Sequence, residues 1–214
     1  MAALPLASEF VELQNVGEFT IAPIRTVPQL DHAWLFLVQI FPFLGDRPPG
    51  PGFFRARLPQ ESPMMLAAKR EQQIAGVALG HLDGDRLGTV DHIAVAASAR
   101  GRGLGRALLS ALESGARALE VRRLTLGSVD EAVGFYERCG YQGRLLLQFA
   151  PPARREEVAA LFADFALLET QWQDVRQLWV QTPQVDNALT DRIRGRDGVH
   201  AQWVMDKDLN APAA

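Results

Sequence analysis

Hydrophobic and polar positions repeat with two different periods over the first two thirds of the chain. Apolar runs rich in branched and aromatic residues, bounded by polar turns, predict strands at residues 19–25, 64–68, 74–81, 87–95, 123–129 and 142–149. Apolar residues at helical spacing predict helices at residues 27–41, 103–119 and 131–139. Because only short polar turns separate the strands of residues 64–95, this segment is expected to form an antiparallel meander. The first part of the chain is therefore predicted to be a mixed α/β domain.

Residues 42–63 interrupt this pattern with five prolines after Pro42, at positions 48, 49, 51, 59 and 63. Such a composition disfavours a long helix or a central strand, and we expect a loop with one short helix near residues 53–58. The segment and its start contain four phenylalanines, Phe41, Phe43, Phe53 and Phe54. They either line a pocket for an acceptor substrate or anchor the loop to the core.

After Pro151 and Pro152 the pattern starts again. We expect helices at residues 154–170 and 186–194 and strands at residues 176–181 and 199–205. The chain is thus predicted to consist of a domain over residues 1–149 and a small α/β extension over residues 150–214. Three tryptophans of the extension, Trp172, Trp179 and Trp203, mark either a partner surface or a compact core.

Composition excludes several classes of protein. The 214 residues are 48% hydrophobic and carry a net charge of -3, so the chain is expected to fold without the basic surface that binds nucleic acid. Cys139 is the only cysteine, and it allows no intramolecular disulfide and no thiolate metal site. The first ten residues lack the pattern of a signal peptide, and no apolar run is long enough to cross a bilayer. We therefore expect a cytoplasmic protein that binds neither nucleic acid nor membrane.

The segment Arg100-Gly101-Arg102-Gly103-Leu104-Gly105, followed by Arg106, lies between a predicted strand and a predicted helix. The start of a helix offers unpaired N–H groups and the positive end of the helix dipole, and glycines allow an anion to approach that backbone. A loop of this kind is therefore suited to binding phosphate. The glycine spacing does not fit a dinucleotide fingerprint, and the Gly-Lys-Ser/Thr ending of a nucleoside triphosphate loop is missing.

The loop matches the pattern Arg/Gln-x-x-Gly-x-Gly/Ala at Arg100, Gly103 and Gly105. Downstream, residues 132–141 read Ala-Val-Gly-Phe-Tyr-Glu-Arg-Cys-Gly-Tyr, which is similar to Ala-x-x-Phe-Tyr-x-x-x-Gly-Phe/Tyr. In these two motifs, and over about residues 19–149, the chain resembles the GNAT superfamily of N-acyltransferases. The resemblance implies a mixed, mostly antiparallel sheet flanked by helices, whose fourth and fifth strands splay apart. The extension resembles a degenerate half of the same fold and is expected to shape the acceptor site or to form a homodimer.

The resemblance also implies the binding site and the reaction. Acetyl-CoA, or another acyl-CoA, would be the co-substrate, an amine would be the acceptor, and no metal would take part. Backbone groups of Ile93 and Val95 would bind the pantetheine and the acyl carbonyl, and the amides from Arg102 to Arg106 would bind the pyrophosphate. Tyr136 would protonate the departing thiolate. Val129 stands where the family often has an asparagine that contacts the cofactor, and Ala97 where it often has proline.

The two residues directly before Ile93, Asp91 and His92, are candidates for the general base. Alternation along a strand predicts that Asp91 and His92 point to opposite faces, so that only one of them can serve the site. The base is therefore His92, Asp91 or water. Cys139 has no base partner evident in the sequence and is expected to be a packed residue. The function predicted is N-acyl transfer, and the alternatives are a non-catalytic acyl-CoA-binding or structural relative and a protein-interaction module.

Overall fold

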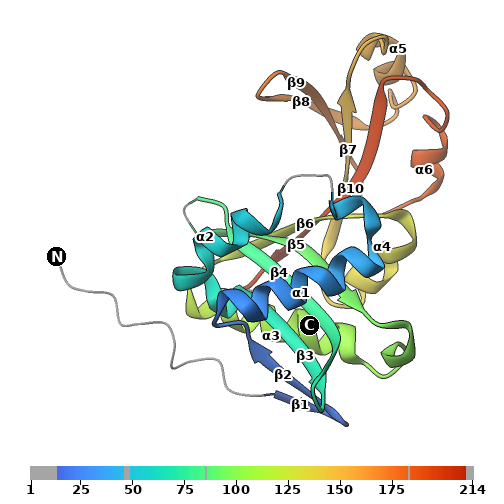
Figure 1. Cartoon of the computed structure of the whole chain (residues 1–214). Helices are drawn as coiled ribbons and strands as arrows, with labels where there is room; N and C mark the ends of the chain where they lie inside the picture. The colour runs from blue at the N-terminus through green and yellow to red at the C-terminus, as the bar shows by residue number, and fades with distance from the viewer. Residues whose placement is uncertain (1–13, 46–48, 85, 183, 211–214) are drawn as a thin grey trace. The chain divides into compact units, whose positions relative to one another are not determined.

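The structure is a computed structural model that describes residues 14–45, 49–84, 86–182 and 184–210. It divides into two compact units, one containing the described residues up to 124 together with 208–210, and the other containing residues 125–207. Each unit has its own group of strands and its own buried side chains (Figure 1). The predicted class is confirmed: the strand pairs are mostly antiparallel, and helices flank them.

The first unit is built on five strands in the order β1-β2-β3-β4-β5, and each strand pairs antiparallel with the next. Their bounds are β1 Gln14–Val16, β2 Phe19–Pro23, β3 Met65–Arg70, β4 Gln73–Leu82 and β5 Leu87–Val95. The short strand β1 was not predicted. The strand β6, Arg123–Ser128, starts in this unit, where the N–H of Arg122 donates to the carbonyl of Arg86 at 2.8 Å.

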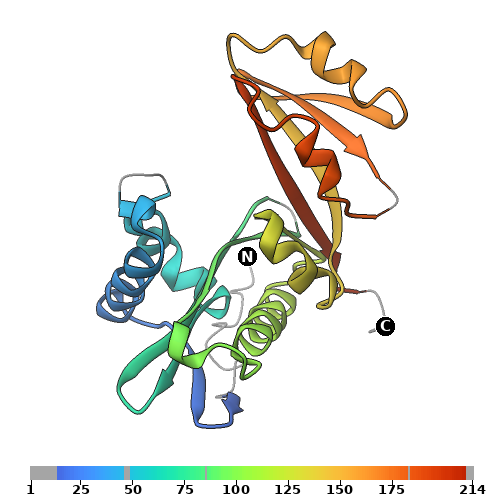
Figure 2. The same cartoon turned by 90° about the vertical axis from the view of Figure 1, so that its right-hand side faces the viewer.

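Helices cover both faces of this sheet (Figure 2). α1 (Val27–Ile40) and α2 (Pro51–Glu61) lie on one face, and α3 (Leu104–Ala118) lies on the other. Between α1 and α2 and the sheet is a core of fully or nearly fully buried side chains, including Leu30, Trp34, Leu37, Phe54, Leu58, Val77, Leu79 and Ala94. Short 3-10 helices at Pro42–Gly45 (η2), Ser62–Met64 (η3) and Ala97–Ala99 (η4) connect these elements.

Local sequence explains where α1 and α2 begin. Thr26 and Gln29 form a capping box, in which each side chain bonds the backbone of the other residue. α2 starts at Pro51, a first-turn position where the missing N–H of proline does not matter, and continues for 11 residues. The short helix predicted at residues 53–58 is therefore longer at both ends. Pro59 lies in its last turn, where it removes one backbone hydrogen bond and the helix ends soon after.

The pairing of β4 with β5 contains an irregularity next to the candidate base residues. Leu79 pairs with His92, but the next residue, Gly80, pairs with Val90. Asp91 is consequently an extra residue in β5 with no partner in this register, which is the definition of a β-bulge.

The second unit contains helices α4 (Asp130–Glu137), α5 (Arg155–Ala160) and α6 (Ala188–Asp191). Its strands are β7 (Gln142–Phe149), β8 (Ala166–Trp172), β9 (Val175–Gln181) and β10 (Val199–Asp208), in the order β10-β7-β9-β8. β7 is central, because it pairs antiparallel with β10 on one side and with β9 on the other. The core of the unit includes Leu145, Leu147, Phe162, Val180, Trp203 and Met205, all fully buried.

The helix predicted at residues 154–170 is wrong beyond Ala160. Residues from Ala166 to Trp172 form β8, which pairs with β9 through seven residue pairs. Apolar residues at helical spacing misled the prediction, because the hairpin partner that decides the outcome lies outside that segment. The helix predicted at residues 186–194 is reduced to one turn. The predicted domain boundary after Phe149 falls inside the second unit and stays a prediction.

Candidate functional site

The glycine loop joins η4 to the start of α3. Gly101 and Gly103 have φ angles of 75° and 77°, in the left-handed region where residues with a Cβ are strained. A Cβ built at either position would meet nothing within 4 Å. These two glycines are thus required by the path of the backbone and not by contact with another part of the protein. The space in front of the loop is open, as an anion site requires.

The start of α3 carries the features that attract phosphate. Gly103 is the N-cap residue, no side chain caps the helix, and the first turn contains no acidic residue. The first N–H groups of a 15-residue helix therefore point out without a partner in the helix itself, at the positive end of its dipole. Arg100, Arg102 and Arg106 are exposed around them. This arrangement fits the pyrophosphate of CoA, which the residues from Arg102 to Arg106 would hold.

Side chains of the loop connect it to the strands. The Nε of Arg100 donates to the carbonyl of Val95 at 3.2 Å, which fixes the loop to the end of β5. The backbone N–H of Ala96 donates to the carbonyl of Ala75 in β4, at 2.9 Å. Since backbone groups alternate in direction along a strand, those of Val95 and Ile93 point to the edge of β5 away from β4. This is the orientation expected if they bind an extended pantetheine chain.

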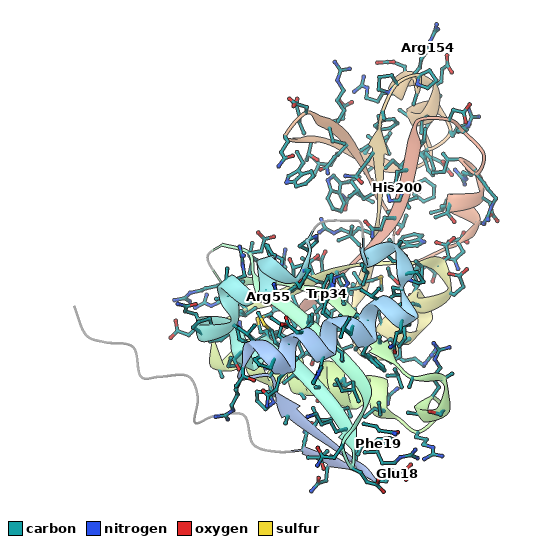
Figure 3. The ribbon with its side chains drawn as sticks, viewed as in Figure 1. Glu18, Phe19, Trp34, Arg55, Arg154 and His200 are labelled. Atoms are coloured by element: carbon teal, nitrogen blue, oxygen red, sulfur yellow. The ribbon has the colours of Figure 1, made fainter. Side chains whose placement is uncertain are left out.

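The side chain of Arg102 is held by an acidic residue that is distant in the sequence. Glu18 lies in the turn between β1 and β2 (Figure 3). Its carboxylate forms ion pairs with Arg102 and with Arg70. All three side chains are about half exposed, so the pairs add little stability. Their effect is to hold the guanidinium of Arg102 beside the loop.

The prediction that Asp91 and His92 point to opposite faces is wrong. Asp91 Oδ2 lies 2.8 Å from Nδ1 of His81, whose ring packs edge-on against Phe53 of α2. His92 packs against Phe54 of the same helix. Both side chains therefore lie on the face covered by α1 and α2. The cause is the bulge at Asp91, because an extra residue in one strand breaks the alternation of side chains.

His81 is the residue that the sequence analysis missed. Its side chain is 15% exposed and that of Asp91 is 10% exposed, so the pair is largely screened from water. Burial lowers the pKa of His81, but the hydrogen bond with Asp91 and the charges of Asp91 and Asp83 outweigh burial and leave the pKa raised. Arg57 lowers it slightly. The only sequence signal was a histidine on a strand, which does not reveal its partner.

His92 has a different environment. Its ring makes an edge contact with Trp34 of α1, with centroids 5.8 Å apart, and a tilted contact with Phe54 at 5.9 Å. Its Nε2 is buried without a hydrogen-bond partner among the described residues. Burial in this apolar setting lowers the pKa of His92, and the charge of Asp91 opposes the effect only in part. The uncharged form of the ring is therefore favoured.

The four phenylalanines of residues 41–54 differ in burial, and the structure shows an anchoring role for some of them. Phe54 is fully buried against Trp34 and is an anchor of the core. Phe53 is partly buried and contacts His81, while Phe43 is 55% exposed and contacts Phe41. Of these four phenylalanines, Phe53 is the one whose ring contacts His81, the partner of Asp91.

Tyr136 belongs to the second unit, on α4. It is buried, with its ring against Phe135 and Tyr141. Burial, with a smaller contribution from Cys139, raises the pKa of Tyr136 to about 12. The phenol therefore keeps its proton at neutral pH, as a proton donor must. Val129, the position where the family often has asparagine, is 66% exposed at the start of the same helix.

The chain is a mixed α/β protein in which a glycine loop lies at the start of a long helix, a position suited to an anion. The sequence model of the acetyltransferase (GNAT) family matches residues 32–141, just over half of the 214 residues. The chain therefore belongs to the GNAT acetyltransferase family, whose members transfer acetyl groups from acetyl-CoA. No curated protein sequence matches it.

Solved structures of similar fold include acetyltransferases from several bacteria. The ribosomal-protein-S18-alanine N-acetyltransferase from Escherichia coli has 18% identity and a TM-score of 0.50, with 91% of this chain and 96% of that chain covered. A candidate N-acetyltransferase from Lactobacillus plantarum has 15% identity and a TM-score of 0.52, with 89% and 98% covered. A candidate GNAT acetyltransferase from Desulfovibrio desulfuricans has 16% identity and a TM-score of 0.50, with 89% and 99% covered. At these identities the likeness concerns the fold alone.

Within the described ranges, no three histidine, cysteine or acidic side chains are grouped so that they could hold a metal ion. None of the described helices combines the length and the apolar character that a membrane span needs.

Proposed function

We propose that this protein transfers an acetyl or other acyl group from acyl-CoA directly to the amine of a small molecule or peptide. The observation that carries the proposal is the open loop of Gly101 and Gly103 at the uncapped start of α3. In a member of the GNAT family, such a loop supports binding of the CoA pyrophosphate. The outward-facing backbone of Ile93 and Val95 supports a place for pantetheine beside β5.

The chain's own groups would divide the chemistry as follows. The amide of Val95 would stabilise the negative charge that develops on the acyl oxygen, which is commonly a large part of catalysis in acyl transfer. Tyr136 is proposed to supply a proton to the CoA thiolate. We further propose that the protein is cytoplasmic and that the extension after Phe149 shapes the acceptor site or mediates self-association.

The proposal is tested in two measurements on the full chain. Calorimetry with acetyl-CoA should give saturable binding at one site. Release of free thiol should then be followed with a panel of amines that includes a polyamine, an aminoglycoside, amino acids, a peptide with a free N-terminus, and a peptide with a blocked N-terminus and a free lysine side chain. Binding with thiol release above the hydrolysis rate supports transfer. Binding without release for every amine favours the non-catalytic acyl-CoA-binding alternative, and no binding overturns the proposal.

A further inference from the structure

We propose that His81, positioned by Asp91 on the bulge of β5, takes the proton from the acceptor amine. This inference rests on the proposed function, since it identifies the base of the same site. The candidates for the base predicted from the sequence are His92, Asp91 and water. His81 is not among them. Three observations lead to it: the geometry of the pair, its surroundings, and the unsuitability of His92.

The pair is built as a base with an orienting carboxylate. Asp91 Oδ2 lies 2.8 Å from Nδ1 of His81, so the carboxylate engages one ring nitrogen and leaves the other, Nε2, outside the pair. Phe53 meets the imidazole edge-on at 87°, with centroids 4.9 Å apart. The ring is thus held from two directions. An imidazole whose orientation and tautomer are fixed by a carboxylate is a common arrangement for proton transfer.

The bulge explains why the carboxylate is available. Asp91 is the residue of β5 that has no register partner, and its side chain is turned toward the face of α1 and α2. A regular strand would have sent it to the other face. Bulges often re-aim a side chain beside a functional site. Asp91 is two residues before Ile93, roughly 7 Å along the strand, and four before Val95, roughly 13 Å, so the pair lies on the same strand, ahead of the segment proposed to hold the acyl-pantetheine group.

The charges around His81 come from three elements. Asp91 is on β5, Asp83 follows β4, and Arg57 is on α2. Glu61 of α2 is also near the end of β4, where its carboxylate accepts the N–H of Leu82 at 3.1 Å. The acidic groups outnumber the basic one, and this favours a cationic acceptor and the protonated form of the base. Burial opposes that form but does not outweigh them.

His92 is less suited to the role. Its ring lies between Trp34 and Phe54, and its Nε2 is buried. The same burial lowers the pKa of His92, so it would hold an accepted proton weakly. We assign it to packing.

The proposed step conserves atoms and charge. His81 takes one proton from the ammonium form of the acceptor, and the lone pair of the freed nitrogen attacks the thioester carbon. A C–N bond forms, the C–S bond breaks, and the electron pair of that bond leaves on sulfur. Tyr136 gives its proton to the CoA thiolate and regains one from the second proton of the nitrogen, while His81 returns the first proton to solvent. The products are an amide, CoA thiol and one proton.

The test compares His81→Gln, Asp91→Asn and the control His32→Gln, which changes an exposed histidine of α1 in the same unit. With an amine that the wild type acylates, His81→Gln should lower kcat by about 10²- to 10⁴-fold and leave acetyl-CoA affinity unchanged. The control should match the wild type. In Asp91→Asn the acid limb of the kcat/KM profile should move to lower pH, because the imidazole loses its carboxylate partner. The amine's own ionisation cancels in this comparison.

Several outcomes overturn the assignment. If His81→Gln stays within threefold of an active wild type, His81 is not the base, but acyl transfer stands. An unmoved acid limb in Asp91→Asn leads to the same conclusion, and this nearly isosteric variant serves if His81→Gln does not fold. A wild type that binds acetyl-CoA yet acylates no amine removes both the assignment and the proposed function.

Discussion

Gly115 of α3 lies directly against the carbonyl of Pro63 in η3. A Cβ at Gly115 would be 1.9 Å from that oxygen and 2.6 Å from the carbonyl carbon, both of them backbone atoms. A glycine in the middle of a helix is ordinarily unfavourable, so its presence here is explained by the close approach. The contact fixes the height of α3 over the sheet, and with it the start of the helix where the glycine loop lies.

The first prediction is that Gly115→Ala destabilises the protein although alanine is the better helix former. The added methyl group must displace backbone, and overpacking of this kind costs about 1–3 kcal/mol or more. Gly52→Ala is the matched control, since a Cβ at this helical position meets nothing within 4 Å. It should stabilise by about 0.4–1 kcal/mol. Urea unfolding of both variants checks the signs, and a Gly115→Ala protein as stable as wild type would contradict the contact.

The second prediction concerns the loop. Gly103→Glu should abolish binding of acetyl-CoA, because it adds a negative charge and a side chain at the proposed phosphate site. The control is Gly195→Glu in the second unit, where φ is also positive, at 78°, and the space is also open. Backbone strain of about 1–2 kcal/mol is common to both, so only the loop variant should lose binding. Calorimetry on folded proteins decides, and equal affinities would remove the loop from the site.

Tyr136→Phe is expected to separate binding from turnover. If the phenol protonates the thiolate, kcat should fall by about 10²- to 10⁴-fold, while acetyl-CoA affinity stays the same. Tyr141→Phe removes a hydroxyl from the neighbouring ring, 5.9 Å away between centroids, and should keep its activity. Thiol release at saturating acyl-CoA measures both. A Tyr136→Phe enzyme within threefold of wild type means that water or another group supplies the proton.

The fourth prediction is that His92 makes the fold sensitive to acid. Since the pKa of His92 is lowered in the folded state, the unfolded state binds the proton more readily. This residue therefore reduces stability progressively as pH falls below about 6.5, the ordinary value. His92→Leu should lose less stability than wild type between neutral pH and pH 5, measured by urea unfolding at each pH.

His81 provides the opposite case for the same experiment. The pKa of His81 is raised, so its stabilising contribution is complete below about 6.5 and is lost as pH rises through the folded-state pKa. His81→Gln should accordingly lose more stability relative to wild type at pH 5 than at pH 8. If His92→Leu and His81→Gln change the pH dependence of the free energy of unfolding in the same direction, the pKa shifts of the two histidines are not opposite, and the prediction is wrong.

The parts of the fold that follow from local sequence could be predicted. β5 has the predicted bounds of residues 87–95, and α3 differs from its prediction by one residue at each end. In both segments the apolar pattern, the turns and the glycine loop all indicate the same structure. Such consistency among local signals allows a structure to be predicted from the sequence. The loop's position between strand and helix followed directly.

The parts that depend on distant residues could not be predicted. The bulge at Asp91 exists only in the register between two strands, so neither strand shows it alone. The pairing of His81 with Asp91 depends on that bulge. The helix predicted over part of β8 is wrong because pairing with β9 decides the state of this segment. In each case the deciding interaction joins segments that a local pattern does not compare.

The position of β10 has a consequence for the order in which the second unit assembles. β8 and β9 are joined by the short turn from Trp172 to Val175 and can pair early, as neighbouring segments do. β10 pairs with β7 through contacts that link Phe149 to Val199, with the whole hairpin between them. Closing so long a loop delays contact formation. We expect the hairpin to form first and β10 to dock late, so that Trp203 becomes buried in the slow phase of refolding and its fluorescence reports that step.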